Sequence, residues 1–203
     1  IHQKVPLQSF LVRIVGLFAI KIKGTKQTMY MVCMENCLNM VRGLRPAHVF
    51  DLKGSKAGRY VKPDGSGKAK GVLKDLNWKE SFFKIRMPQS IMTNIREALT
   101  RDVNFLRAFN IVDYSLLVGV NTQDAHNRRR FWISVIDILQ LFNMKKRGER
   151  FVKKSVLGQK DVSCEDTITY ATRFLAFAFE QVFAEAEESG ICDIGMQGFE
   201  AFM

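Results

Sequence analysis

The sequence has little of what marks several classes of protein. Four cysteines in 203 residues are too few and too scattered for a disulfide framework, and Cys33 and Cys37 lack the second ligand pair of a zinc site. No apolar run reaches the ~18 residues that a membrane span needs, and the best candidate, residues 10–20, is interrupted by Arg13. The N-terminus shows no basic-then-apolar signal pattern. We therefore expect a cytoplasmic protein with reduced thiols that meets membranes only at their surface.

Basic residues outnumber acidic ones, and their distribution is uneven. Lysine and arginine total 31 against 20 aspartates and glutamates, which gives a formal net charge of +11. Six acidic residues and no basic one follow Arg173, so residues 1–173 alone carry +17. Such a field attracts polyanions, whether nucleic acid, anionic lipid or phosphorylated small molecules. Charge alone does not choose among these partners.

The apolar pattern predicts one mixed domain. At ~150 residues per domain the chain holds one, and its 47% hydrophobic and 25% charged residues are ordinary globular proportions. Helical spacing of apolar residues predicts helices over residues 88–109 and 170–186. Strands are predicted where β-branched and aromatic residues cluster, at 10–22, 29–34, 49–53, 111–120 and 131–142. This order favours an α+β domain over regular βαβ units.

Several familiar site motifs fail on inspection. The stretch Gly65-Ser66-Gly67-Lys68 has Lys62 where a P-loop needs its first glycine and Ala69 where it needs serine or threonine. The three histidines lie far apart and have no metal-ligand spacing. Nucleic-acid binding is not expected, because the chain has neither aromatic RNP strings nor a recognition-helix motif.

Three acidic residues lie at the ends of predicted strands, and a lysine accompanies the first. They are Asp51 with Lys53, then Asp113, then Asp137. A carboxylate among buried residues is costly to desolvate unless it is paired or holds a metal. Each acid alone could instead cap a turn or pair with an arginine. Together they match what phosphoryl transfer needs, namely oxygen ligands for Mg²⁺ and a carboxylate that orients a hydroxyl nucleophile.

The strings around these residues resemble the phosphatidylinositol phosphate kinases. The most specific are D-L-K-G-S at residues 51–55 and D-Y-S-L-L-V-G at residues 113–119. The match continues in order through L-K-D-L at 73–76, R-D-V-N-F-L at 101–106, I-D-I-L-Q at 136–140, K-K at 145–146 and Y-x-x-R-F at 170–174. Neither the His-Arg-Asp nor the Asp-Phe-Gly string of protein kinases occurs.

The resemblance implies a kinase-like fold with ATP between two lobes. It implies that Asp113 and Lys53 act in catalysis beside Asp51, with Lys53 also contacting the ATP phosphates. It implies that Asp137 binds Mg²⁺ and ATP. The hinge, whose backbone would hydrogen-bond adenine, is expected at Met34, Glu35 and Asn36.

The resemblance also gives the basic segment a role. Residues 143–165 correspond to the activation or specificity loop, which in the family recognises the lipid headgroup and touches the membrane. The residues expected to do so are Lys145, Lys146, Glu149, Arg150, Lys153 and Lys154. A one-residue insertion before Glu149 leaves open whether the loop resembles type I or type II enzymes.

No glycine-rich phosphate-covering loop precedes Leu11, so we expect residues 1–203 to hold a large lobe with an incomplete N-terminal lobe. The implied activity is that of an ATP- and Mg²⁺-dependent phosphatidylinositol 4-phosphate 5-kinase producing phosphatidylinositol 4,5-bisphosphate. The alternative is an inactive pseudokinase that binds phosphoinositides. The expected partners are ATP, phosphatidylinositol phosphate and an anionic membrane. A homodimer is also compatible with the resemblance. We expect the protein to lie peripherally at the inner face of membranes.

Overall fold

A computed structural model describes residues 9–24, 26–39, 44–65, 70–121, 130–142 and 166–186. The expected activation loop, residues 143–165, and its six candidate lipid-binding residues lie outside this part of the chain. In the described part, helices combine with mostly antiparallel sheets, in line with the predicted α+β class. None of the described helices is long and apolar enough to cross a membrane.

A three-stranded antiparallel sheet forms the centre of the domain. Its strands lie in the order β3 (His48–Leu52), β5 (Ser115–Asn121) and β6 (Arg130–Ile136). Six of the seven residues of β5 are buried, which explains its near-continuous apolar sequence. The sheet extends along β6 through Phe10 and Val12, whose backbones bond to Val135.

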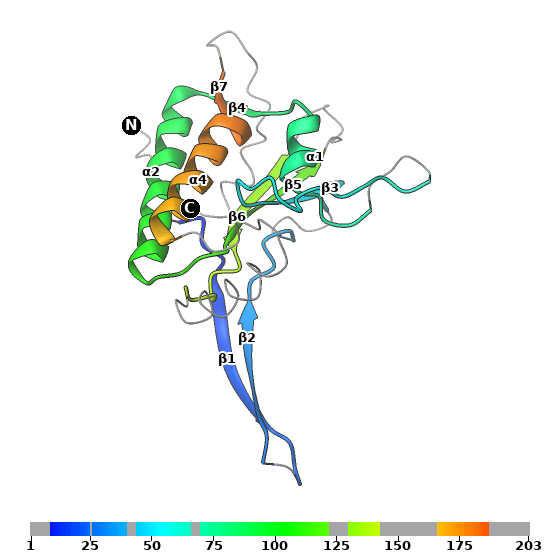
Figure 1. Cartoon of the computed structure of the whole chain (residues 1–203), viewed down its shortest axis with the longest axis vertical. Coiled ribbons are helices and arrows are strands. Elements are labelled where there is room, and N and C mark those ends of the chain that lie inside the picture. The colour runs from blue at the N-terminus through cyan, green and yellow to red at the C-terminus, as the bar shows by residue number, and fades with distance from the viewer. Residues whose placement is uncertain are drawn as a thin grey trace, which may run out of the picture.

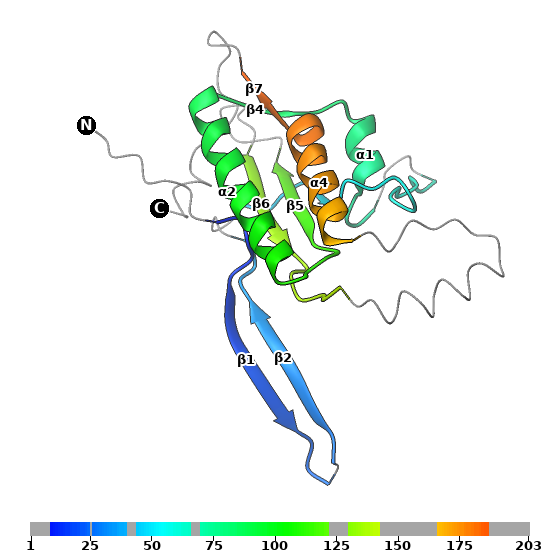
Figure 2. The ribbon, with the colours of Figure 1, turned by 60° about the vertical axis from the view of Figure 1, so that its left-hand side comes forward.

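Two helices pack side by side against this sheet (Figures 1 and 2). In α2 (Gln89–Ala108) the buried apolar residues recur at steps of three and four, as the sequence predicts. Pro88 lies just before the helix, where a backbone N–H would have no intrahelical acceptor, so the missing N–H of proline costs no helical hydrogen bond. The second helix, α4 (Thr167–Phe177), starts at Asp166, whose carboxylate accepts hydrogen bonds from the N–H groups of Ile168 and Thr169.

The predicted helix over residues 170–186 ends earlier than expected. After α4 the chain makes one π-helical turn, η1 (Ala178–Val182), and then a strand, β7 (Phe183–Glu185). This strand pairs in parallel with β4 (Ile85–Met87), almost a hundred residues earlier. A short helix that the sequence did not predict, α1 (Asp75–Glu80), places Trp78 in the core, where its indole N–H donates to the Gln181 carbonyl.

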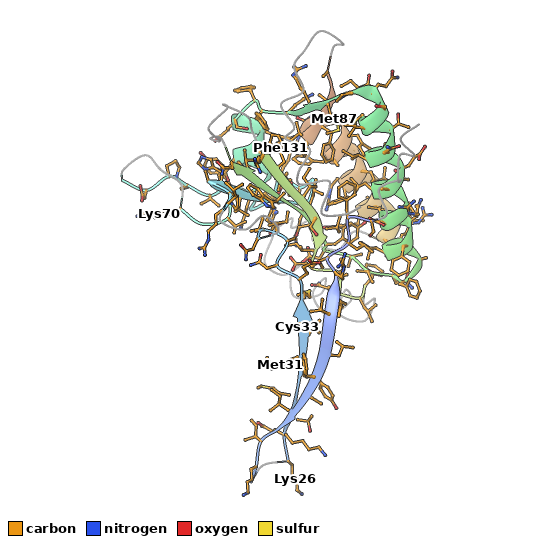
Figure 3. All side chains as sticks on the ribbon, turned by 180° about the vertical axis from the view of Figure 1, so that it is seen from behind. Lys26, Met31, Cys33, Lys70, Met87 and Phe131 are labelled. Atoms are coloured by element: carbon orange, nitrogen blue, oxygen red, sulfur yellow. The ribbon has the colours of Figure 1, made fainter. Side chains whose placement is uncertain are left out.

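A hairpin of β1 (Ile14–Lys21) and β2 (Thr28–Met34) extends away from this body (Figure 1). Figure 3 shows Lys26 at its tip, with Met31 and Cys33 along its length. Its strands are apolar on both faces yet exposed: Leu17 is 74% and Tyr30 82% exposed. Among the described helices and strands, β1 and β2 pack extensively only against each other.

A buried carboxylate joins the N-terminal segment to α2. Asp102 accepts hydrogen bonds from the Phe10 N–H at 2.5 Å and the Ser9 hydroxyl at 3.1 Å. Burial raises the pKa of Asp102, because the charged form loses its hydration, although these bonds oppose the shift. The segment that leads into the hairpin is therefore held by an acid whose ionisation is linked to folding.

We expect this linkage to appear as a pH-dependent stability. Between about pH 4 and the raised native pKa of Asp102, the native carboxyl binds more protons than the unfolded one, so the unfolding free energy falls as pH rises. Asp102→Asn should remove this component, so wild-type stability relative to the variant should decline with pH in urea unfolding. The control Glu97→Gln, on the exposed face of α2, should keep the wild-type slope. A wild-type slope in Asp102→Asn would refute the linkage.

Candidate active site

Strand order brings the predicted acidic residues to one edge of the central sheet. Because β5 runs antiparallel to both neighbours, its first residues lie beside the last residues of β3 and β6. Leu52 pairs with Leu116, and Ser115 pairs with Ile136. The residue that follows β3 is Lys53, and the residue that follows β6 is Asp137.

Lys53 and Asp113 form the direct contact of the site. The Lys53 ammonium lies 2.8 Å from Asp113 Oδ1, and the lysine side chain is only 15% exposed whereas the aspartate is 52% exposed. Asp113 occupies a left-handed backbone conformation, with φ of 66°, in the turn between α2 and β5. This conformation is unfavourable for a residue with a Cβ and occurs often at functional sites. The turn presents the carboxylate to solvent beside a nearly buried cation.

Asp137 has the same backbone conformation at the end of β6. Its φ is 62°, its side chain is exposed, and the Ser115 hydroxyl donates to its Oδ2 at 3.4 Å. Both acids therefore stand just outside their strands, in turns that direct them to the same sheet edge. The predicted strands over 111–120 and 131–142 included both acids, whereas β5 begins only at Ser115 and β6 already ends at Ile136.

A single exposed carboxylate fits the way proteins usually bind Mg²⁺. That ion keeps several waters and takes one or two carboxylates together with substrate phosphates. Within the described ranges, no three His, Cys, Asp or Glu side chains gather into a self-sufficient metal site. Asp137 is thus suited to hold Mg²⁺ only jointly with a phosphate-bearing ligand.

Asp51, also expected among the catalytic residues, faces another partner. Its carboxylate lies 2.9 Å from an Arg59 nitrogen, and the side chain is 24% exposed. Arg59 also bonds the buried carboxylate of Asp75 at 2.6 Å. Burial alone would lower the pKa of Arg59, but the bonds and charges of Asp75 and Asp51 outweigh it and raise that pKa. Asp75 and Arg59 were given no role from the sequence, although Asp75 lies in the L-K-D-L string.

The expected hinge residues lie where the hairpin joins the body (Figure 1). Met34 ends β2, and the Glu35 N–H donates to the Arg13 carbonyl at 2.9 Å. The Asn36 side-chain oxygen accepts a hydrogen bond from the Leu38 N–H at 3.1 Å. The structure thus places these residues in the connection between hairpin and body.

Aromatic residues of α4 pack against Tyr114, the residue that follows Asp113. The Tyr170 hydroxyl donates to the Tyr114 carbonyl at 2.5 Å, and the Tyr114 ring packs edge-on against Tyr170 and Phe174. Burial raises the pKa of Tyr170, and the nearby charge of Asp113 raises it further. The residue beside Asp113 is therefore fixed by a buried, neutral phenol on α4.

Gly54 allows the turn after Lys53 to approach α4 closely. Its φ is +72°, and a Cβ at this position would stand 2.9 Å from the Arg173 carbonyl oxygen and 3.0 Å from Phe177 Cβ. The close approach anchors the D-L-K-G-S turn against the helix.

We expect Gly54→Ala to lower the unfolding free energy by about 2–4 kcal/mol, because left-handed strain adds to overpacking against backbone. Gly58→Ala is a matched control, since Gly58 has φ of +65° but open space around its Cβ position. The control should show only the strain, about 1–2 kcal/mol. Equal losses in urea unfolding would show that contact with α4 contributes nothing.

Comparisons with known proteins agree with the motifs. A family model described as phosphatidylinositol-4-phosphate 5-kinase matches residues 2–131 and 121–181. The chain is 28% identical to 1-phosphatidylinositol 3-phosphate 5-kinase FAB1 of Saccharomyces cerevisiae over 83% of its length. It is 33% identical to 1-phosphatidylinositol-3-phosphate 5-kinase FAB1A of Arabidopsis thaliana over 72%, and 34% identical to phosphatidylinositol 4-phosphate 5-kinase 1 of that plant over 62%. The chain spans only 8%, 8% and 16% of these relatives.

Proposed function

Since the chain belongs to the phosphatidylinositol-4-phosphate 5-kinase family, we propose that it is part of a lipid kinase that phosphorylates the inositol ring of a phosphatidylinositol phosphate. The observation that carries this proposal is the Lys53–Asp113 contact of 2.8 Å, at the sheet edge that also bears Asp137. A nearly buried cation beside an exposed carboxylate suits the transfer of a negatively charged phosphoryl group to a hydroxyl.

Each residue of the site has a distinct task in this proposal. Asp113 orients the inositol hydroxyl and accepts its proton as the oxygen bonds to the γ-phosphorus of ATP. The bond from that phosphorus to the β,γ-bridging oxygen breaks, and ADP leaves with its electron pair. Lys53 neutralises charge on the transferring phosphoryl group, and Asp137 would hold Mg²⁺ together with the ATP phosphates. When bound, the metal supplies positive charge that stabilises the phosphate oxygens. A kinase-like arrangement would place adenine at Met34, Glu35 and Asn36, with ATP between the hairpin side and the body.

The position of phosphorylation is proposed to be the 5-hydroxyl. The three relatives described above are all named 5-kinases. Two are named for phosphatidylinositol 3-phosphate as substrate and one for phosphatidylinositol 4-phosphate. Because two of these three are phosphatidylinositol 3-phosphate 5-kinases by name, we favour phosphatidylinositol 3-phosphate as the substrate. Phosphatidylinositol 4-phosphate, the substrate expected from the sequence motifs, is the second candidate and is supported by the family description.

The test is transfer of labelled phosphate from ATP by the complete product of the gene. Vesicles would contain phosphatidylinositol, its 3-phosphate or its 4-phosphate, and deacylated products would be separated by chromatography. We expect 5-phosphorylated product with Mg²⁺, at least tenfold more from the preferred monophosphate than from phosphatidylinositol. Asp113→Asn is the negative control. Vesicle binding without any labelled lipid would overturn the kinase proposal in favour of a phosphoinositide-binding pseudokinase.

We also propose that the basic residues of 143–165 bring the site to an anionic membrane. Lysine or arginine near such a surface adds about 1 kcal/mol to binding, so this segment alone could contribute several. The proposed location is peripheral, at the cytoplasmic face of a membrane. This follows from the substrate class and from the basic character of the chain, with a net charge of +11.

A further inference from the structure

Asp75 is a buried acid whose bonds lead to the catalytic lysine. It is 0% exposed at the first position of α1, and its Oδ1 accepts hydrogen bonds from the Lys53 N–H at 2.9 Å and the Gly54 N–H at 2.7 Å. The residues that donate are therefore the third and fourth residues of the D-L-K-G-S turn, Lys53 and Gly54. A carboxylate that accepts two adjacent backbone N–H groups fixes the path of that backbone.

The other oxygen of Asp75 is held by Arg59. The Arg59 Nε donates to Asp75 Oδ2 at 2.6 Å, while another guanidinium nitrogen donates to the Asp51 carboxylate at 2.9 Å and to the Asp51 carbonyl. Arg59 thus ties α1 to the end of β3. Both Asp75 oxygens are engaged within the protein, and the side chain has no surface on which a substrate could bind. It cannot act as a catalytic residue.

The strand end is held from a further direction. The Asp51 N–H donates to the Leu73 carbonyl at 2.8 Å, and the Leu73 N–H donates to the Val49 carbonyl at 2.8 Å. Residues 73–75 therefore run beside β3 and deliver Asp75 to the point where that strand ends. Lysine has a long, flexible side chain, so its ammonium is placed reliably only when its backbone is fixed.

We propose that Asp75 and Arg59 are positioning residues, which hold Lys53 against Asp113 by fixing the backbone of the Lys53–Gly54 turn. The inference rests on the proposed function, because Lys53 must act in phosphoryl transfer for its position to matter. Misplacement of a reacting group by about 1 Å can reduce a rate about 100-fold. The pair therefore sets the rate of transfer without touching substrate.

Asp75→Asn is the direct test in the complete gene product. Asparagine must turn its NH₂ group toward either Arg59 or the two backbone N–H groups, so one set of bonds is lost. We expect kcat to fall about 10- to 100-fold, with a smaller change in KM for ATP. Asp64→Asn is the matched control, because it removes the same charge from a partly exposed ion pair with the exposed Lys70, and it should keep wild-type kcat.

A double-mutant cycle separates positioning from a merely structural role. If Asp75 acts through Lys53, then Asp75→Asn should cause no further loss of kcat in a Lys53→Ala background. Losses that multiply would overturn the proposal. Should Asp75→Asn fail to fold, Arg59→Lys takes its place. It keeps the charge but cannot bond Asp75 and Asp51 together, and it should lower kcat about 3- to 10-fold with the same non-additivity.

A readout without activity uses the 203-residue chain itself. Reductive methylation followed by mass spectrometry measures how readily each lysine reacts, and Lys53 should be protected by its burial and its ion pair. Asp75→Asn should raise the labelling rate of Lys53 several-fold while that of exposed Lys84 stays constant. An unchanged Lys53 rate would overturn the proposal. The two proposals can fail separately. If Lys53→Ala kept full activity while Asp75→Asn still raised the labelling rate of Lys53, the proposed role of Lys53 in transfer would fail and the positioning contact would stand.

Discussion

Asp137→Asn is expected to reduce Mg²⁺-dependent phosphoryl transfer by about 100-fold or more while leaving the fold intact. The side chain is exposed and stands outside β6, so an isosteric amide disturbs no core packing. The amide lacks the charge with which Asp137 would hold Mg²⁺ against the ATP phosphates. A 100-fold loss corresponds to about 2.7 kcal/mol of barrier, within the several kcal/mol that a metal ion supplies.

The loss should appear in kcat more than in KM, because a metal ligand acts mainly in the transition state. Steady-state kinetics of the complete gene product at rising Mg²⁺ would measure it, and thermal unfolding would report on the fold. Ser115→Ala is an informative companion, since it removes the 3.4 Å hydrogen bond to Asp137 but leaves the carboxylate. It should cost less than tenfold. Retention of more than about a tenth of wild-type activity in Asp137→Asn would contradict the assignment.

The residues of the candidate site could be predicted from sequence because the short strings mark them, and strand order then explains why they meet. The strings identified Asp113, Asp137 and Lys53, and apolar runs identified the strands they adjoin. Antiparallel pairing of β5 with both neighbours then brings one strand start and two strand ends to the same edge. What the pattern could not show is that both acids have positive φ, since Asp is only a weak signal for this conformation.

The residues that support the site were not predictable because their contacts are distant in sequence. Asp75 bonds residues 21 and 22 positions earlier, and α1 is too short to produce a helical period. The sequence does not distinguish a buried aspartate paired with an arginine from a charged pair on the surface. The L-K-D-L string marked the region but carried no information about which atoms Asp75 would bond.

The end of the second helix shows the same limit. Phe179 and Phe183 continue the four-residue apolar spacing of α4, and no glycine or proline stands near Val182 to signal a stop. The chain nevertheless leaves the helix at Val182 because β4 accepts β7 as a parallel neighbour. Phe183 is buried in β7, at 1% exposure, so an apolar residue at this position suits the strand as well as the helix that its spacing predicts.

Replacing Lys145, Lys146, Lys153 and Lys154 together with alanine is expected to weaken binding to phosphoinositide-containing vesicles by up to about a thousandfold. These residues lie in the basic segment outside the described part of the chain. Each lysine near an anionic surface contributes about 1 kcal/mol, so four contribute up to ~4 kcal/mol. Sedimentation with vesicles at 0.05 to 0.5 M salt would measure the loss. Wild-type binding should also fall with salt, because the Debye length shortens from about 14 to 4 Å.

A variant of equal charge distinguishes a local role of this segment from a general electrostatic one. Alanine at Lys23, Lys26, Lys62 and Lys84 removes the same four charges from exposed positions in the described part of the chain. Either variant lowers the net charge of residues 1–173 from +17 to +13, so both keep a diffuse attraction to anionic lipid. If the segment faces the membrane, its variant should lose at least tenfold more affinity than the control, because charges several Debye lengths from the surface are screened. Equal losses would show that the segment has no special place at the membrane and that only total charge matters.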